Sequence, residues 1–263
     1  MRARAVMIGT AVALVLAACR PDTVRVAFAP TQGARYRYDV HVRAVTRSTL
    51  ADGAPRDSVD DFVLHAEHRV VAVGHNDTEL EVKLDIPGVG ERTFTALFDR
   101  GAQLRRIESI EGVPATALGE LGLSEILPGA AGAPPQQELA PGDRWSIDSP
   151  AAVLGGGGSR LKGSGRLVAL GVVRGRAVAT VESRYRLPVR RTTSSGRAVI
   201  ELDGFQTTVV RTVRSLKDGA VESAKAVTNA RYRVTLRPPL GSSGAPVTGR
   251  LAVEVRSTTA RLR

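Results

Sequence analysis

Cysteine occurs once in the 263 residues, at position 19. A single cysteine excludes an internal disulfide and a zinc site built from several thiolates. Histidine is scarce as well, with four residues in the chain. His65 and His68 are close in sequence, but on a strand they would point to opposite faces and could not bind one ion together. The sequence therefore predicts no metal site and no cofactor.

The chain also has few aromatic residues, which make up 4% of it, although hydrophobic residues make up 43%. A core can form, but it must consist mainly of valine, leucine and alanine. Lysine is rare too, because all but four of the 37 basic residues are arginines. The excess of arginine has two interpretations: a GC-rich genome, or selection for a function of the arginine side chain.

Motifs of the common enzyme classes are missing. Gly163-Ser164-Gly165 has the wrong spacing for the nucleophile turn of a serine hydrolase, and no helical pattern follows it. The glycine run at 155–158 is not followed by the Lys and Ser or Thr of a phosphate-binding loop. We therefore predict no catalytic residues and no enzyme, with a hydrolase as a remote alternative.

What the sequence does contain is a strict alternation of residue types. In residues 35–43 the even positions are tyrosine or valine and the odd positions are charged or histidine. The same period of two recurs at 79–86, 231–237 and 250–256. Such alternation is typical of antiparallel strands with one face buried and one in water. The predicted fold is all-β: a long-stranded antiparallel meander that forms a curled sheet or barrel.

One segment departs from this period. Residues 116–127 are rich in leucine, with Thr116 as an N-cap and Pro128-Gly129 as a stop, and they predict one short helix. If the helix forms, its leucines would cap the open end of the curled sheet.

The N-terminus has the features of an export signal. Two arginines precede an uncharged apolar stretch that ends at Ala18, and this stretch is too short to span a bilayer as a helix. Leu16-Ala17-Ala18-Cys19 resembles the lipobox of bacterial lipoproteins. The resemblance implies cleavage before Cys19 and lipidation of that residue. Arg20 follows where an aspartate would favour the inner membrane, so an outer-membrane location on the periplasmic face is favoured over the inner membrane.

A second resemblance concerns the mature chain. Tyr36 and Tyr38 on the first long strand, the turn Phe98–Gly101 and the segment Pro141–Trp145 are similar to features of an uncharacterised group of β-rich envelope lipoproteins. This similarity implies a β-barrel-like fold and no known activity. Trp145 is expected to pack in the core or at a sheet edge.

These observations divide the chain into four parts. Residues 1–18 are the signal peptide and 19–33 the lipidated N-terminus and tether, followed by an N-terminal β half, 34–150, and a basic C-terminal β half, 151–263. We expect the two halves to form one domain. Arg69–Gly74 resembles Arg166–Gly171, and Phe98–Ala102 resembles Leu216–Ala220, so the halves are either two pseudo-repeats or converged meanders.

Charge is divided unequally between the halves. From Cys19 to Pro150 there are 14 basic and 20 acidic residues, a net charge of −6, whereas from Ala151 onward there are 21 basic and 6 acidic, a net charge of +15. This asymmetry indicates a polyanionic partner or simply arginines on a wet face. The residues predicted to bind an anionic surface alternate along strands: Arg184, Arg186, Arg231, Arg233 and Arg250.

Together these features predict a lipid-anchored cell-envelope protein that acts as an interaction or structural protein. Its partners would be the membrane through its anchor and an anionic lipid, lipopolysaccharide or envelope protein, but not nucleic acid. The alternative is a carrier or binder of an apolar ligand or lipid in a β-barrel-like cavity. A cavity of roughly several hundred Å³ would favour the carrier, and a filled interior with an arginine surface would favour the interaction protein.

Overall fold

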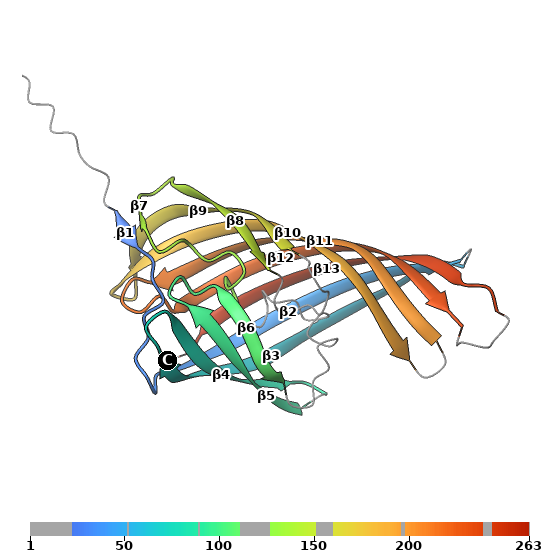
Figure 1. Cartoon of the computed structure of the whole chain (residues 1–263), viewed down its shortest axis with the longest axis horizontal. Coiled ribbons are helices and arrows are strands. Elements are labelled where there is room, and N and C mark those ends of the chain that lie inside the picture. Colours follow the sequence, from blue (N-terminus) through green and yellow to red (C-terminus); the bar gives the residue numbers. More distant parts are fainter. Residues whose placement is uncertain are drawn as a thin grey trace, which may run out of the picture.

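Long antiparallel strands make up almost all of the regular structure (Figure 1). The computed structural model describes residues 23–51, 53–88, 90–110, 127–150, 160–195, 198–238 and 244–262. The strands are β1 (Val24–Arg25), β2 (Arg35–Leu50), β3 (Arg56–Val73), β4 (Asp77–Ile86), β5 (Gly90–Asp99), β6 (Leu104–Ile110), β7 (Glu138–Leu139), β8 (Arg144–Pro150), β9 (Arg160–Val173), β10 (Arg176–Ser195), β11 (Ala198–Ser215), β12 (Val221–Arg237) and β13 (Val247–Arg261).

Eleven of these strands form one sheet in the order β6-β5-β4-β3-β2-β13-β12-β11-β10-β9-β8. All pairings within it are antiparallel. The sheet curls around one side, with β6 and β8 as its edges (Figure 1). The prediction of an all-β antiparallel curled sheet is confirmed.

The pairing of β2 with β13 joins an N-terminal strand to the last strand at the middle of the sheet. On one side of β13 lie β2 to β6, and on the other lie β12 to β8, so each side of the sheet is a meander of consecutive strands. β8 belongs to the half 34–150 by sequence, but it pairs with β9 on the side of the C-terminal strands. Both halves contribute to one continuous sheet. The internal duplication stays a prediction, and the glycine run at 155–158 lies outside the described residues.

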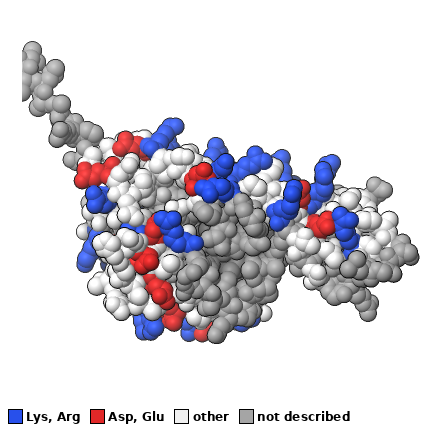
Figure 2. Space-filling view, in the orientation of Figure 1, with Lys and Arg blue, Asp and Glu red and all other residues white. Residues whose placement is uncertain are grey.

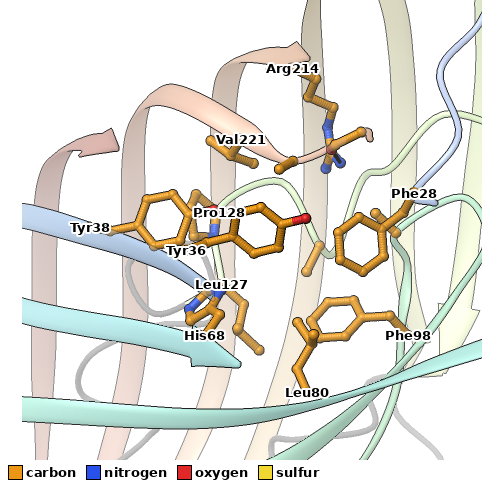
Figure 3. Close-up of a pocket in the computed structure, with 14 residues that line it drawn as sticks. Phe28, Tyr36, Tyr38, His68, Leu80, Phe98, Leu127, Pro128, Arg214 and Val221 are labelled. Atoms are coloured by element: carbon orange, nitrogen blue, oxygen red, sulfur yellow. Dashed lines mark hydrogen bonds between the residues drawn. The ribbon is translucent and has the colours of Figure 1, made fainter. Parts of the chain in front are cut away.

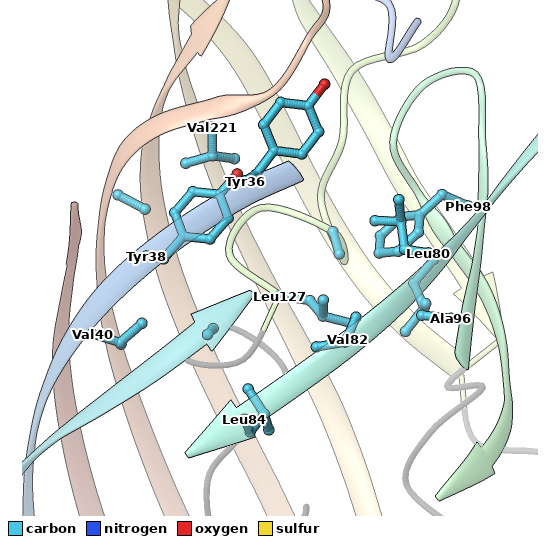
Figure 4. Packing of buried hydrophobic residues seen from close by; sticks show 14 of the residues in the cluster. Tyr36, Tyr38, Val40, Leu80, Val82, Leu84, Ala96, Phe98, Leu127 and Val221 are labelled. Carbon is cyan, nitrogen blue, oxygen red and sulfur yellow. The ribbon is translucent and has the colours of Figure 1, made fainter. Parts of the chain in front are cut away.

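The inner, concave face of the sheet carries the core, because apolar residues occupy every second position. On β2 the buried residues are Tyr36, Tyr38, Val40 and Val42, as the alternation predicts. They pack with Leu80, Val82 and Leu84 of β4 (Figure 4). Of the other residues expected to be buried, Val234 and Val255 are, but Tyr232 and Val253 stay partly exposed. Tyr232 is opposite Gly204 and Leu251, and Val253 is opposite Ala230 and Thr46.

A loop fills part of the concave side. Residues 127–135, here named the inner loop, contain no strand, yet Leu127, Pro128, Gly129, Ala130, Ala131, Gly132 and Pro134 are buried. The predicted helix at 116–127 lies outside the described residues except for Leu127, which is in a bend.

The segment before β2 is also packed. β1 pairs with β7, and Val26 and Phe28 are buried. The backbone N–H of Phe28 donates to the carbonyl of Arg100 at 2.6 Å, and that of Ala29 donates to the carbonyl of Asp218 at 3.0 Å. Part of the segment expected to be a tether, 19–33, is therefore attached to the domain.

Candidate functional site

The arginines predicted to bind an anionic surface all lie on the outer, convex face of the sheet. Arg184 and Arg186 are exposed on β10, between the buried Ser183, Tyr185 and Leu187. The same alternation exposes Arg231 and Arg233 on β12 and Arg250 on β13. Because side chains of a strand alternate between faces, these five side chains share one face.

The structure separates the five arginines into two groups. Arg233 is directly opposite Arg250 across the β12–β13 ladder, with Arg231 two residues away. Arg184 and Arg186 lie on β10, which is separated from β12 by β11. On β11 the residues opposite Arg184 and Arg186 are Val209 and Thr207. The five arginines therefore do not form one contiguous cluster by themselves.

Further basic side chains lie on the same outer face. Arg211 on β11 is opposite Lys225 on β12, and Arg256 on β13 is opposite Arg43 on β2. All four are exposed. The sequence pattern pointed to these positions only weakly, because the strand register that brings them together cannot be read from one segment. The basic outer face is defined here as Arg43, Arg184, Arg186, Arg211, Lys225, Arg231, Arg233, Arg250 and Arg256.

Three of the cross-strand pairs on this face therefore join like charges: Arg211 with Lys225, Arg233 with Arg250, and Arg256 with Arg43. Like charges directly opposite each other destabilise a sheet, whereas opposite charges stabilise it. Only Arg256 has an ion pair, with Glu254 at 2.7 Å, among the members of this face that the structure describes. On the neighbouring ladders Arg211 is opposite Glu182, Arg233 is opposite Asp203 and Arg43 is opposite Asp61, so one member of each like-charge pair also has a carboxylate directly opposite it.

Arginines elsewhere on the outer surface have carboxylate partners. Arg237 binds Glu201 through two hydrogen bonds, and Arg160 binds Asp148 at 2.7 Å. In the N-terminal half, Arg35 and Arg37 both contact Glu67, and Arg69 contacts Glu81. Figure 2 shows this intermingling of blue and red over the N-terminal strands and blue projections along the upper edge of the molecule.

A small cavity lies on the inner face, in the apolar core. Its volume is about 40 Å³. Sites for drug-sized ligands occupy roughly 300–1,000 Å³. The lining residues are Phe28, Tyr36, Tyr38, His68, Leu80, Phe98, Ala102, Leu127, Pro128, Ala130, Arg214, Gly219, Ala220 and Val221 (Figure 3). In the described part of the chain, the inner loop occupies space that a larger ligand would need.

Arg214 is a buried basic residue of this lining. It follows Val210 and Thr212 on the inner face of β11, and its exposed fraction is 3%. Its guanidinium donates to the carbonyl of Gly219 at 3.2 Å and to that of Gly129, in the inner loop, at 2.9 Å. Burial lowers the pKa of Arg214 to about 10, with the nearby Tyr38 acting in the opposite direction. Sequence analysis missed this residue. Arg214 nevertheless lies two and four residues after Thr212 and Val210, and this spacing indicates that the three side chains point to the same, inner face.

Two tyrosines border the same cavity. The hydroxyl of Tyr36 donates to Asp218 Oδ2 at 3.3 Å, and the guanidinium of Arg261 lies 4.7 Å from the centre of the Tyr36 ring. Burial raises the pKa of both Tyr36 and Tyr38. For Tyr36 the negative charge of Asp218 and the hydrogen bond to it raise the pKa further.

Two of the segments behind the second resemblance, Phe98–Gly101 and Pro141–Trp145, contain turns held by an aspartate. The Asp99 carboxylate accepts the backbone N–H groups of Gly101 and Gln103, each at 2.9 Å. The Asp143 carboxylate accepts the N–H of Ala140 at 2.8 Å, and Gly142 has a φ of +98° that favours glycine. Trp145 packs against two core clusters on the edge strand β8, which confirms its expected role.

The histidines do not come together. His65 is exposed and contacts Asp39 at 2.7 Å, whereas His68 is buried on the opposite face. Within the described residues, no group of three or more histidine, cysteine, aspartate or glutamate side chains could hold a metal ion. Cys19, the predicted lipidation site, lies outside the described residues.

No described helix is long and apolar enough to cross a membrane. The described residues define an all-β protein whose 11-stranded antiparallel sheet curls around a core, with basic side chains on its convex face and the buried Arg214 on its concave face.

No protein-family model matches the chain, and comparison with curated proteins gives no match. Among solved structures, the attachment invasion locus protein Ail of Yersinia pestis, in complex with the heparin analogue sucrose octasulfate, is 7% identical with a TM-score of 0.14. That comparison covers 87% of this chain and 99% of Ail. OccAB4 of Acinetobacter baumannii is 6% identical with a TM-score of 0.18, over 88% of this chain and 99% of OccAB4. Similarity this low carries no argument about function.

Proposed function

We propose that the protein is a lipid-anchored interaction protein of the cell envelope that binds an anionic lipid surface through its basic outer face. The observation that carries the proposal is the set of three like-charge pairs across neighbouring strands: Arg211 with Lys225, Arg233 with Arg250, and Arg256 with Arg43. By themselves such pairs destabilise the sheet. Phosphate groups bound over them would form charge-assisted hydrogen bonds with both basic side chains and so make the contribution to stability favourable.

The anchor predicted at Cys19 supports this function. Residues 20–23 separate Cys19 from β1, and an extended chain spans at most roughly 3.5 Å per residue. A lipid on Cys19 would hold the domain within a short distance of the membrane, where each basic residue gains about 1 kcal/mol from an anionic surface. We place the protein on the periplasmic face of the outer membrane, on the basis of Arg20 after the lipobox.

Sedimentation with vesicles tests the proposal. The chain from residue 20 onward contains every described strand and core residue, and it should pellet with phosphatidylglycerol vesicles at low salt but not with phosphatidylcholine vesicles. Rising salt should release it, because exposed charges are screened beyond about 8 Å at physiological ionic strength. A second set of vesicles that contain lipopolysaccharide distinguishes the two sources of phosphate.

A matched pair of triple variants localises the binding. Arg211→Gln, Arg233→Gln and Arg250→Gln together should weaken binding on the order of a hundredfold. Arg35→Gln, Arg37→Gln and Arg69→Gln remove the same charge from the N-terminal half, where the arginines have carboxylate partners, and should change binding little. Equal binding to both lipids, or equal loss in both triple variants, would contradict the proposal.

The second candidate function is a carrier of an apolar ligand. The specific observation in its favour is the buried cation of Arg214 beside walls that are mainly aromatic and aliphatic. The cavity of about 40 Å³ is smaller than a carrier needs, so a ligand would have to displace the inner loop.

A further inference from the structure

Arg214 is a buried cation whose charge no described carboxylate neutralises. Its two hydrogen bonds go to the backbone carbonyls of Gly129 and Gly219, which are neutral acceptors. The Nε atom is buried and has no hydrogen-bond partner in the described part of the chain. Buried charges in proteins are normally paired, because the free energy lost when a charge leaves water exceeds the stabilisation from hydrogen bonds to neutral groups.

The cavity places this charge against apolar walls. Phe28, Leu80, Phe98 and Val221 line it together with the ring of Tyr36 (Figure 3). An electrostatic attraction is stronger in such surroundings than in water. Any anion that reached the cavity would therefore be held by Arg214 more firmly than by an exposed arginine of the outer face.

The size of the cavity restricts the anion. About 40 Å³ is a few times the roughly 10–15 Å³ needed for one water molecule, so a carboxylate fits but a complete lipid does not. Arginine also suits a carboxylate geometrically, since its planar N–H groups can bind both oxygens.

A longer apolar group could extend only where the inner loop now packs. Leu127 and Pro128 of this loop line the cavity, and Leu127 contacts the core cluster that includes Leu80 and Val82 (Figure 4). The loop contains no strand, and the backbone hydrogen bonds of Ala130 with Leu104 and Leu127, together with the Arg214 bond to Gly129, hold this part of it. Ser183 also donates to the carbonyl of Gly132 at 2.7 Å, and displacing the loop would break these bonds without opening a strand pair of the sheet.

We propose that this cavity binds the carboxylate head group of an apolar molecule of the fatty-acid class. Arg214 binds the head group, and the hydrocarbon chain replaces Leu127 against the aromatic walls. The site lies on the concave face and does not depend on the basic outer face, so failure of one proposal leaves the other intact.

Calorimetry with three soluble probes tests the site. The full chain is held in nanodiscs of neutral lipid, and empty nanodiscs are the blank. Octanoate should bind at least about tenfold more tightly than octanol, which lacks the charge, and than acetate, which lacks the chain. Equal affinity for octanol would overturn the role of the charge, and equal affinity for acetate would overturn the role of the apolar chain.

Two variants assign the charge to Arg214. Arg214→Met should remove the preference for octanoate over octanol, whereas Arg190→Met, an exposed arginine on β10 outside the basic outer face, should keep it. Circular dichroism checks that both variants fold. If Arg214→Met does not fold, Arg214→Lys keeps a charge at this position and should retain a weaker preference, which the same titration measures. Retention of the full preference in a folded Arg214→Met variant would overturn the proposal.

Discussion

Arg214 and Gly129 are 85 residues apart in the chain, and the guanidinium of the first donates to the carbonyl of the second at 2.9 Å. This bond joins β11 to the inner loop. Gly129 has a φ of +76°, and a Cβ atom there would lie 2.8 Å from both Arg214 Nη2 and Thr212 Cγ2. The inner loop therefore needs glycine at this position for its backbone conformation and for the approach of the arginine.

Gly129→Ala should accordingly destabilise the protein more than a change at another left-handed glycine. Gly142 is the control, because its φ is +98° and nothing lies within 4 Å of its Cβ position. Gly142→Ala should cost about 1–2 kcal/mol from the backbone alone, and Gly129→Ala at least ~1 kcal/mol more from the crowding. Urea unfolding measures the stability of both variants. Equal losses of stability would mean that the inner loop shifts to accommodate the added Cβ atom without cost.

A charge at the centre of the core should unfold the domain. Val82 is fully buried on β4, so Val82→Asp should cost several kcal/mol. Val234→Asp should cost less, because Val234 is 9% exposed and belongs to none of the three core clusters. Val59→Asp is the control, since Val59 is 57% exposed, and its effect should stay within about 0.5 kcal/mol. A Val82→Asp variant with an unchanged unfolding midpoint would contradict the assigned inner face.

The long strands could be predicted because the alternation of apolar and polar residues is visible within each segment of the sequence. The alternation at 35–43 lies within β2, and that at 79–86 lies within β4. Each alternates between a core and a solvent face, and that contrast is a property of the residues themselves.

The inner loop could not be predicted in the same way. Ala130 to Pro135 consists of small residues without a period, which indicates only a loop. Its burial comes from contacts with distant strands: Ser183 on β10 donates to the carbonyl of Gly132, and Arg214 donates to that of Gly129. Contacts of this kind depend on the curl of the sheet, so the cavity and its cation were missed with the loop.

The outer arginines were predicted correctly as exposed, but their grouping was not. Whether Arg186 lies near Arg231 depends on the strand order, in which β11 separates them. Arg186 instead lies over the ring of Phe205, 3.8 Å from its centre. Strand register rather than sequence spacing also creates the like-charge pair of Arg256 with Arg43.

The edge strand β8 depends on a close contact between Trp145 and Gly165. These residues are directly opposite each other, and a Cβ atom on Gly165 would overlap the indole ring. Gly165→Ala should therefore displace Trp145 and cost about 1–3 kcal/mol, with a shift in tryptophan fluorescence from the one tryptophan in the chain. Gly171→Ala is the control, because Gly171 is on the same strand β9 and nothing lies within 4 Å of its Cβ position. It should change stability by no more than about 0.5 kcal/mol and leave the fluorescence unchanged.

Lipidation at Cys19 rests on the lipobox and is tested by one substitution. Cys19→Ser removes the thiol that would carry the lipid, and no other cysteine can replace it. The variant should lose membrane association, while intact-mass measurement of the unaltered chain should show cleavage before Cys19 and added acyl mass. A wild-type chain that is uncut and unmodified would reject the anchor and, with it, the proposed location.

Alkaline pH should destabilise the protein through Tyr36 and Tyr38. Burial is the main cause that raises the pKa of both, so the folded state keeps two protons that the unfolded chain releases near its ordinary pKa of about 10. Their stabilising contribution is present below that pH and falls as pH rises above it, because the folded state then binds more protons than the unfolded state. Urea midpoints should therefore fall between about pH 9 and about pH 11.

The double variant Tyr36→Phe and Tyr38→Phe isolates this contribution. Arg214 acts in the opposite direction. Burial lowers its pKa to about 10, so as the pH rises the folded state loses the guanidinium proton before the unfolded state does. Both the wild type and the variant contain Arg214, so its effect cancels when their midpoints are compared at each pH. The variant should lose less stability than the wild type over this range. Parallel loss in the two chains would show that the tyrosine hydroxyls do not cause the alkaline transition.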